Sequence, residues 1–428
     1  MNESFLHYIW QLQYFNKKDL MTTENERVQI TYPGTANSNS GPDFSNAKLN
    51  VADIEWAGNV EIHTVSSAWT AHGHQHDSAY DNVILHVVWQ DDAPVFRSDG
   101  SRMPTLELQH RVDLNLIHRY RQLADNPSST PCEKSFGSVN RIIKISMLDK
   151  AMMQRLETKA MQVTQLFFQA GKDWEELTYR LLAKNFGFKI NGDPFLALAL
   201  ALPQRILLKH SDSLLQTEAL LFGQAGFLDY AMKDDYAKLL QREFHILSVK
   251  YSLEKDKLNF AVWKFMRMRP ANFPTLRIAQ FSALIHKNKN LFSRILDAKH
   301  IADVTAFFDV SLSAYWHHHY RFGRATTQFS SSIGSDSVEN IMINSIAPLL
   351  VAYGKYKEDQ QFVDRAIAFL QAIPAESNKI TKSWKAMGMD AHSAFDSQAL
   401  IELNNNFCLK RNCLSCAIGA ALLKPGSE

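Results

Sequence analysis

Residues 41–89 read GPDFSNAKLNVADIEWAGNVEIHTVSSAWTAHGHQHDSAYDNVILHVVW. Apolar and polar residues alternate over residues 47–51 and again over residues 59–65, a pattern that predicts two strands of an antiparallel hairpin. Ala57-Gly58 and Ala52-Asp53 are both candidate turns between these strands. The nearly continuous β-branched run at residues 83–89 predicts a central strand buried on both faces. The stretch therefore predicts the core of a β-sheet.

Shorter elements on either side complete the predicted sheet domain. Apolar spacing over residues 3–15 predicts an opening helix with Glu3 in its first turn, and residues 28–32 predict a short strand. Residues 33–42 are dense in turn formers and predict a loop that leads to Asp43. Residues 95–96 and 105–108 predict two edge strands around Asp99-Gly100. One helix followed by several strands favours an α+β domain that ends near Asn126.

The spacing of apolar residues changes after a linker at residues 125–132 that contains two prolines. After the linker, apolar residues recur every three to four positions instead of every second position, which predicts helices. These are expected over residues 143–168, 174–186, 195–209, 214–222, 235–249, 281–291 and 338–352. The predicted fold class is therefore α+β. An N-terminal mixed-sheet domain (1–126) precedes a mostly α-helical domain (133–400) and a cysteine-containing C-terminal segment (401–428).

Composition limits the class of protein and its partners. The chain has 428 residues, of which 46% are apolar and 21% charged, as expected for a folded, soluble protein of two or three units. We find neither a leader pattern nor an apolar run long enough for a membrane span, so the expected location is cytoplasmic. Residues 1–130 carry nine basic and sixteen acidic residues, whereas the remainder carries 37 and 28. This asymmetry suits a cation bound by the first part and a polyanion bound by the second, although a mosaic of solvated faces would also explain it.

Three polar residues of the predicted hairpin could share a metal ion. Residues two apart on a strand project from one face, so Glu61 and His63 should point the same way. A turn near Ala52-Asp53 would bring Asp43 back opposite them. Carboxylates favour Mg²⁺ or Mn²⁺, and an added imidazole shifts the preference toward Mn²⁺, Fe or Zn²⁺. Such an ion would activate water and neutralise charge on a phosphodiester.

This arrangement resembles the PD-(D/E)XK nuclease superfamily, whose core is restriction-endonuclease-like. There an aspartate that opens one strand and a Glu-x-Lys on the next strand bind the metal, often with a glutamate from the preceding helix. The resemblance implies that Asp43, Glu61 and Glu3 take these three roles. The sequence departs from the motif at His63, which stands where the superfamily usually has lysine. His63 would then be a metal ligand or an acid/base group.

Histidines are concentrated directly after the hairpin. His72, His74 and His76 are followed by Asp77, and on either a strand or a loop they could add ligands to the site. They could equally belong to a solvated loop. His76 is taken as an auxiliary metal ligand. His86 lies in an apolar run, where a satisfied core histidine is the expected outcome.

The cysteines suggest a second cofactor. The spacing Cys408-x4-Cys413-x2-Cys416, with Cys132 as a remote fourth thiol, matches the pattern of plant-type ferredoxins, and Zn²⁺ accepts the same ligands. Some PD-(D/E)XK nucleases hold an iron–sulfur cluster with one remote cysteine and a C-terminal trio, but their remote cysteine precedes the nuclease motifs. The alternative is a set of buried, reduced cysteines.

Two insertions in the helical part could contact nucleic acid, either DNA or RNA. Residues 267–277 contain two prolines and three arginines, and residues 315–324 combine aromatic residues with three histidines and two arginines. Both could pair with or stack on a nucleic-acid strand, or they could form contacts between domains. The candidate contact residues are Arg267, Arg269, Arg277 and Arg321.

As a whole, the chain resembles a bacterial family known as domain of unknown function 2851. The resemblance rests on FLHYIW, GPDF, WAGNVEIH, the residues from HGHQHD to VILHVVW, RPANFPTLRIAQ and CLKRNCLSCAIG. It implies the two-part layout but no activity.

Three functions follow as hypotheses. The first is a metal-dependent, nuclease-like phosphodiesterase. The second is a non-catalytic module that binds nucleic acid or protein and keeps a degenerate nuclease core. The third is a zinc-dependent hydrolase that acts on a small substrate through the histidines.

Overall fold

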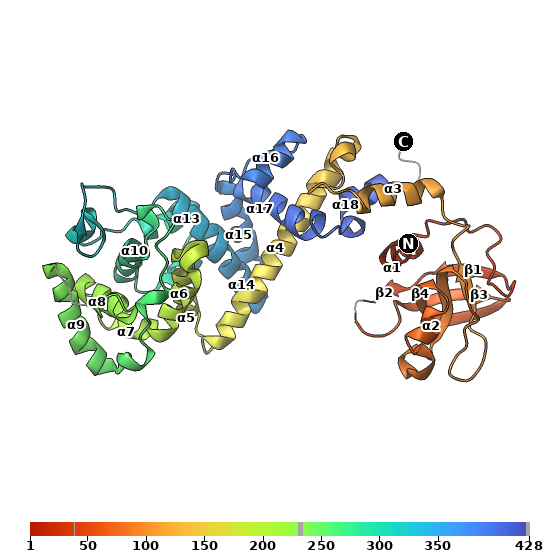
Figure 1. The fold of residues 1–428 in the computed structure, drawn as a ribbon, viewed down its shortest axis with the longest axis horizontal. Coiled ribbons are helices and arrows are strands. Elements are labelled where there is room, and N and C mark those ends of the chain that lie inside the picture. Colours follow the sequence, from red (N-terminus) through yellow and green to blue (C-terminus); the bar gives the residue numbers. More distant parts are fainter. Residues whose placement is uncertain (38, 230–233, 425–428) are drawn as a thin grey trace. The chain divides into compact units, whose positions relative to one another are not determined.

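A computed structural model describes residues 1–37, 39–229 and 234–424 of the 428-residue chain (Figure 1). The chain forms two compact units, one made of Met1–Leu148 with Glu402–Glu428 and the other of Asp149–Ile401. Residues 402–424 of the predicted C-terminal segment 401–428 are thus part of the sheet-containing unit, and this unit continues past Asn126. Residues 425–428 of that predicted segment lie outside the described residues. No helix among the described residues is both long and apolar enough to cross a membrane.

The first unit contains a mixed sheet, and the second is mostly helical, as the predicted α+β class requires. The strand order is β1 (Val28–Tyr32), β3 (Phe44–Val51), β4 (Ile54–Val65), β5 (Val83–Gln90) and β6 (Thr105–Glu107). The pairs β1–β3 and β3–β4 are antiparallel, whereas β4–β5 and β5–β6 are parallel. Strand β2 (Thr35–Ala36) pairs with the start of β3. Strand β3 is therefore antiparallel to both β1 and β4.

The hairpin turns at Ala52-Asp53 and not at Ala57-Gly58. Ala52 and Asp53 both have left-handed backbone angles, with φ of 50° and 65°, as a tight two-residue hairpin turn requires. Gly58 lies within β4, where an added Cβ would come within 2.6 Å of the Asn82 carbonyl oxygen. The glycine thus permits a close approach between two chain segments instead of a turn.

Strand β4 has a buried polar face as well as a buried apolar one. Val60 and Ile62 are buried on one face, and Glu61 and His63 are buried on the other, at 5% and 2% exposure. Helix α1 (Glu3–Leu12), capped by the Asn2 side chain, packs against this strand. The sheet thus places acidic and imidazole groups where most strands place apolar ones.

The connection from β4 to β5 is short and compact. It contains helix α2 (Ala68–Ala71) and two 3-10 turns, His74–His76 and Ser78–Tyr80. Trp69 of α2 is buried with Val83, Val95 and Met103, and Tyr80 packs against this cluster. The buried tryptophan therefore holds the histidine-rich connection against the sheet.

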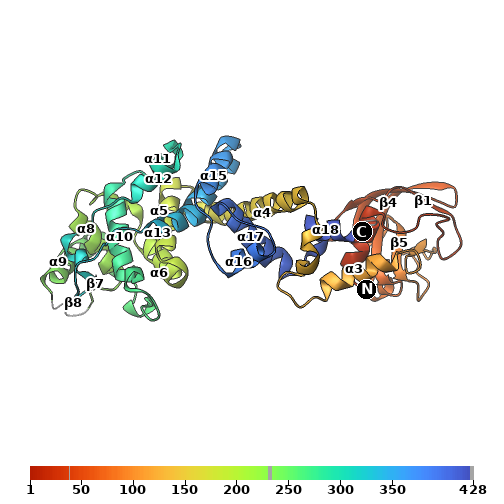
Figure 2. The ribbon, with the colours of Figure 1, turned by 90° about the horizontal axis from the view of Figure 1, so that it is seen from above.

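The C-terminal residues return to the first unit. The turn Cys413–Ser415 packs against α1, and helix α18 (Ala417–Leu423) packs against helix α3 (Leu114–Ala124), beside which it lies in both ribbon views (Figures 1 and 2). The Tyr8 hydroxyl of α1 donates a hydrogen bond of 3.5 Å to the Ala420 carbonyl. Helix α1 and the segment that leads into α18 therefore meet on the sheet-containing unit.

Helices make up most of the remainder. Each of the seven predicted ranges is largely helical, but 195–209 is divided at Leu202-Pro203, 281–291 is divided at residues 288–290, and 338–352 contains a π-helical turn. The longest, α4 (Arg141–Gln169), begins in the first unit and ends in the second. Residues Met342–Ile346 form a π-helical turn. The other helices are α5 (Trp174–Phe186), α6 (Phe188–Ala201), α7 (Gln204–Leu208), α8 (Leu214–Gln224), α9 (Asp235–Tyr251), α10 (Pro274–Lys287), α11 (Leu291–Asp297), α12 (Ile301–Thr305), α13 (Ser335–Ile341), α14 (Ala347–Lys357), α15 (Gln360–Ala372), α16 (Lys379–Ala386) and α17 (Ala394–Glu402).

A carboxyl group is fully buried in the helical unit. Glu218 of α8 accepts hydrogen bonds from the hydroxyls of Tyr236 and Ser313. Burial nevertheless raises the pKa of Glu218 to about 7. The folded state therefore holds the Glu218 proton more tightly than the unfolded state does.

This carboxyl group should make the helical unit less stable as pH rises. Between about pH 4.5 and 7, the contribution of Glu218 to the free energy of unfolding should fall by about 2 to 3 kcal/mol. The variant Glu218→Gln should not show this fall in the free energy of unfolding. The measurement is hydrogen exchange of the α8 amides in both proteins at pH 5 and pH 8, corrected for intrinsic exchange rates. Equal changes in protection would contradict the prediction.

Candidate metal centre

Two carboxylates join the entrance of β3 to the middle of β4. The Asp43 backbone N–H donates a hydrogen bond of 3.0 Å to Glu61 Oε2, and the Ile62 N–H donates one of 2.9 Å to Asp43 Oδ2. The strand register pairs Phe44 with Val60, which sets Asp43 opposite Glu61. The Ala52-Asp53 turn thus brings the predicted residues Asp43 and Glu61 together.

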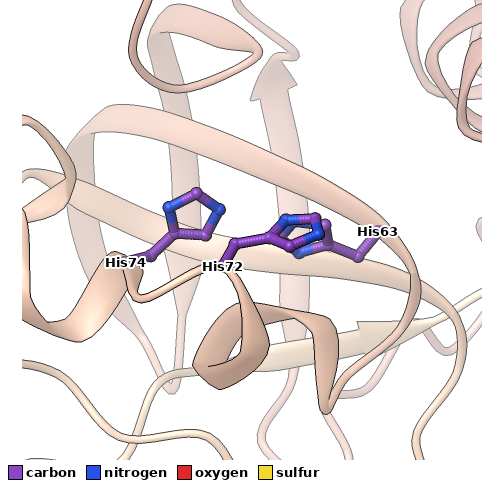
Figure 3. A group of neighbouring side chains, drawn as sticks. All are labelled: His63, His72 and His74. Carbon is purple, nitrogen blue, oxygen red and sulfur yellow. The ribbon is translucent and has the colours of Figure 1, made fainter.

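Three histidines form a group beside these carboxylates. His63 comes from β4, whereas His72 and His74 come from the end of α2 and the turn that follows it (Figure 3). One ring nitrogen from each lies within 4.8 Å of the other two, so this group could hold a metal ion. His63 is buried, His74 is half-buried and His72 is exposed, so the group extends from the interior to the surface.

Glu61 connects the histidine group to Asp43. Its Oε1 lies 3.6 Å from His63 Nε2 and 3.5 Å from His74 Nε2, while its Oε2 accepts the Asp43 N–H. Asp43 Oδ2 lies 3.2 Å from Nε2 of His7, which α1 supplies. One continuous polar cluster therefore contains two carboxylates and four imidazoles.

A fifth histidine, His86, contacts His63 of the histidine group. His63 Nδ1 lies 2.8 Å from Nε2 of His86, a fully buried residue of β5. If Nδ1 of His63 carries the proton and donates it to His86, Nε2 of His63 presents a lone pair toward Glu61 and His74. Outer partners of this kind commonly fix the ring and the tautomer of a metal-binding histidine. With that tautomer, His86 would be a positioning residue for His63.

Burial sets the protonation of the cluster. Burial, followed by the charge of Asp43, raises the pKa of Glu61 to about 8. Burial, followed by the neighbouring rings of His74 and His72, lowers the pKa of His63 to about 4. Burial also lowers the pKa of His86 well below its ordinary value. At neutral pH the imidazoles of His63 and His86 are therefore neutral, as metal ligands and their partners must be.

The donors present fit a divalent transition metal. Among the described residues, the buried Nε2 atom of His74 has no hydrogen-bond partner, although Glu61 lies nearby. Burying a polar nitrogen without a partner is costly, and coordination would satisfy it. Several imidazoles with a carboxylate suit Zn²⁺, Mn²⁺ or Fe²⁺ better than Mg²⁺, which prefers oxygen ligands.

The other predicted members of the site lie at its margin. His76 is exposed and does not belong to the histidine group, because the 3-10 turn directs His74 and not His76 toward Glu61. Glu3 is exposed on α1 but close enough for its charge to raise the pKa of Glu61. Asp77 caps the following 3-10 turn by accepting the Ala79 N–H.

Two contributors were not anticipated from the sequence. His7 approaches from α1, and nothing in its spacing relates it to Asp43. His86 was expected to be a satisfied core histidine, and its bond to His63 does satisfy one of its nitrogens. Its position in register with Glu61 on the adjacent parallel strand is the pattern that could have indicated its role.

The candidate nucleic-acid contacts differ in accessibility. Arg267 and Arg269 are exposed. Arg321 lies over the rings of Phe265 and Phe273, at 5.4 and 4.8 Å from their centroids.

Arg277, by contrast, is buried on α10. Its guanidinium donates to Gln280, Asn272 and Ser337, and burial lowers its pKa to about 10. It therefore supports the helical unit internally and does not offer a surface contact.

The fold and this cluster define an α+β protein whose sheet carries a site that could hold a metal ion. The chain matches the family described as Protein of unknown function (DUF2851) over residues 3–379, and it belongs to that family. The match ends before the three C-terminal cysteines. No curated protein and no solved structure matches the chain significantly.

The histidine group can be tested by metal binding. The variant His74→Ala should weaken binding of Zn²⁺ or Mn²⁺ by more than the roughly 10- to 100-fold that loss of an outer-shell partner causes. The variant His76→Ala changes an exposed ring two residues away and should leave the affinity unchanged. Isothermal titration calorimetry of the chelator-treated protein measures both. Equal losses in the two variants would contradict the assignment.

Proposed function

We propose that this protein is a metal-dependent phosphodiesterase that acts on nucleic acid. The observation that carries the proposal is the position of Glu61, which lies between Asp43 on one side and His63 and His74 on the other. A single cation at Glu61 could thus be shared by a carboxylate pair and an imidazole group. A bound divalent cation would supply Lewis-acid activation of water and stabilisation of charge on the phosphodiester.

The resemblance to PD-(D/E)XK nucleases supports the choice of reaction. Its aspartate and glutamate correspond to Asp43 and Glu61, which are adjacent across the hairpin. An antiparallel hairpin followed by a parallel strand, with α1 packed against it, also agrees with the mixed-sheet core that the resemblance implies. Glu3 on α1 lies near enough to influence Glu61, as the helical glutamate of that superfamily would.

His63 takes the part of a ligand in this proposal and not that of the missing lysine. Its imidazole is neutral at neutral pH because burial lowers its pKa to about 4, so it offers a lone pair instead of a positive charge. His86 holds the ring through Nδ1, which leaves Nε2 directed at the site. His63 therefore does not supply the fixed cation that the lysine would place near the phosphate; the imidazole of His7 lies at the other end of the cluster, 3.2 Å from Asp43.

The substrate class rests on charge. The second part of the sequence has an excess of basic residues, and Arg267 and Arg269 are exposed in an insertion of the helical unit. Phosphate contacts by lysine and arginine supply most of the sequence-independent affinity for nucleic acid. DNA and RNA both satisfy this chemistry.

A second candidate is a zinc-dependent hydrolase of a small substrate. It is favoured by the histidine group, because three imidazoles are a common ligand set of catalytic zinc. The two candidates differ in the substrate cleaved and not in the metal ligands.

Replacement of Glu61 tests the proposed function. The variant Glu61→Gln keeps the size of the side chain but removes its charge, so cleavage of DNA or RNA should fall by about a hundredfold or more. The variant Glu55→Gln makes the same change at an exposed position of the same strand and should retain the wild-type rate. Rates are measured on labelled single- and double-stranded substrates with Mn²⁺, Zn²⁺ or Mg²⁺, and again after treatment with a chelator.

Three outcomes would count against the nuclease. Equal rates for the two variants would show that Glu61 is not part of the catalytic site. Cleavage that survives treatment with a chelator would show that the reaction does not need a metal. Absence of cleavage by the wild type with all three metals would leave a binding module or a hydrolase of small substrates. Hydrolysis of small phosphate or carboxyl esters that depends on His74 would support the second of these.

A further inference from the structure

All four cysteines of the chain are buried in the first unit and none forms a disulfide. Cys132 follows α3 and its linker, while Cys408, Cys413 and Cys416 lie between α17 and α18. Nearly 280 residues separate the first from the other three, so their presence in one unit is a product of the fold. Buried cysteines alone can be inert core residues, so a ligand site also requires that the segments carrying them lie together.

Hydrogen bonds hold the C-terminal loop to the segment that precedes Cys132. The Arg411 guanidinium donates to the Ser128 carbonyl at 2.8 Å and to the Cys408 carbonyl at 3.1 Å. The Ala417 N–H contacts Met147 Sδ at 3.2 Å. Gly419 follows closely after the trio, and a Cβ there would lie 2.2 Å from the Cys413 carbonyl oxygen. The loop is therefore closely packed in the place where it brings the thiols toward Cys132.

The four thiols also affect one another electrostatically. Burial, then Cys416 and Cys413, raises the pKa of Cys132 to about 12. Burial, then the other three thiols, raises the pKa of Cys408, and burial, then Cys416, raises the pKa of Cys413 to about 11. The neighbouring thiols thus contribute to these shifts, in agreement with the hydrogen bonds that hold the C-terminal loop beside the segment preceding Cys132.

We propose that Cys132, Cys408, Cys413 and Cys416 ligate an iron–sulfur cluster. Their spacing in the chain, three thiols as C-x4-C-x2-C with a remote fourth, is one that holds such clusters. Each thiol gives up its proton when it becomes a ligand. This site is separate from the proposed hydrolytic centre, whose ligands are carboxylates and imidazoles.

The spread of the thiols favours a cluster over a single zinc ion. Zinc–sulfur bonds of about 2.3 Å in a tetrahedron place the sulfurs within about 4 Å of one another. Within the described ranges, the histidine group is the only set of three such ligand atoms lying within 4.8 Å of one another. No three of the thiols therefore lie within 4.8 Å of one another, which is a wider arrangement than the tetrahedron of one zinc ion.

The cluster would help to hold the C-terminal turn and α18 against α1 and α3. The turn that contains Cys413 packs against α1, and α18 packs against α3. Phe5 of α1 stacks on Tyr120 of α3, with 4.0 Å between the ring centroids, and the Asn2 side chain bonds the Tyr120 hydroxyl. Because α1 also carries His7 and Glu3, the cluster would help to hold two residues that border the metal centre.

The experiment is metal and sulfide analysis of the full-length protein purified without oxygen from iron-supplemented cells. We expect iron and acid-labile sulfide in equal amounts, a broad visible absorption band, and an electron paramagnetic resonance signal in the oxidised or the dithionite-reduced protein. The variant Cys132→Ser should lose most of the iron and sulfide. The variant Lys410→Gln changes an exposed residue of the same loop and should retain both.

Several results would overturn the proposal. Stoichiometric zinc without sulfide would show that the four thiols bind zinc. Protein free of metal would show that they are reduced cysteines of the hydrophobic core. Full iron and sulfide in Cys132→Ser would exclude the remote ligand. The wild-type composition decides the issue even if the cysteine variant does not fold, and activity of the hydrolytic centre is not needed for it.

Discussion

The pair of hydrogen bonds that joins Asp43 to β4 is the interaction on which the candidate site depends. The Asp43 N–H binds Glu61, and the Ile62 N–H binds Asp43, so each carboxylate is fixed by the backbone of the other's strand. Bonds between backbone N–H groups and a carboxylate are among the stronger hydrogen bonds in proteins. They hold two acidic side chains close together, with Glu61 buried and Asp43 half-buried, an arrangement that a cation could stabilise.

The surrounding imidazoles follow from the same constraint. A neutral ring is the form that burial favours, and burial lowers the pKa of His63 to about 4. Glu61 meanwhile has its pKa raised to about 8, so without a cation it tends to hold a proton. A metal ion would reverse this tendency by stabilising the carboxylate, and the neutral rings would lose nothing by binding it. The helical unit is organised differently, with its buried Glu218 satisfied by two hydroxyls.

Much of this fold could be predicted from local pattern, because alternation and helical spacing report which faces are buried. The pattern located β4 and the pairing of Glu61 with His63, but it could not place the turn. Ala52 and Asp53 adopt left-handed angles without glycine, whereas Gly58 serves a close approach to the Asn82 carbonyl. The local pattern reports neither these backbone angles nor this close approach. The same limit explains His7 and Arg277, since neither the approach of α1 to Asp43 nor the burial of α10 is visible in spacing.

The central claim is that His63, His72 and His74 bind a metal ion together with Glu61. Crystals of the protein soaked in Mn²⁺, with diffraction data collected just above and just below the manganese absorption edge, would test it directly. We expect one anomalous difference peak that is bonded to the three imidazoles and lies within coordination distance of Glu61. A peak elsewhere, or no peak at a manganese concentration that saturates binding in solution, would contradict the account.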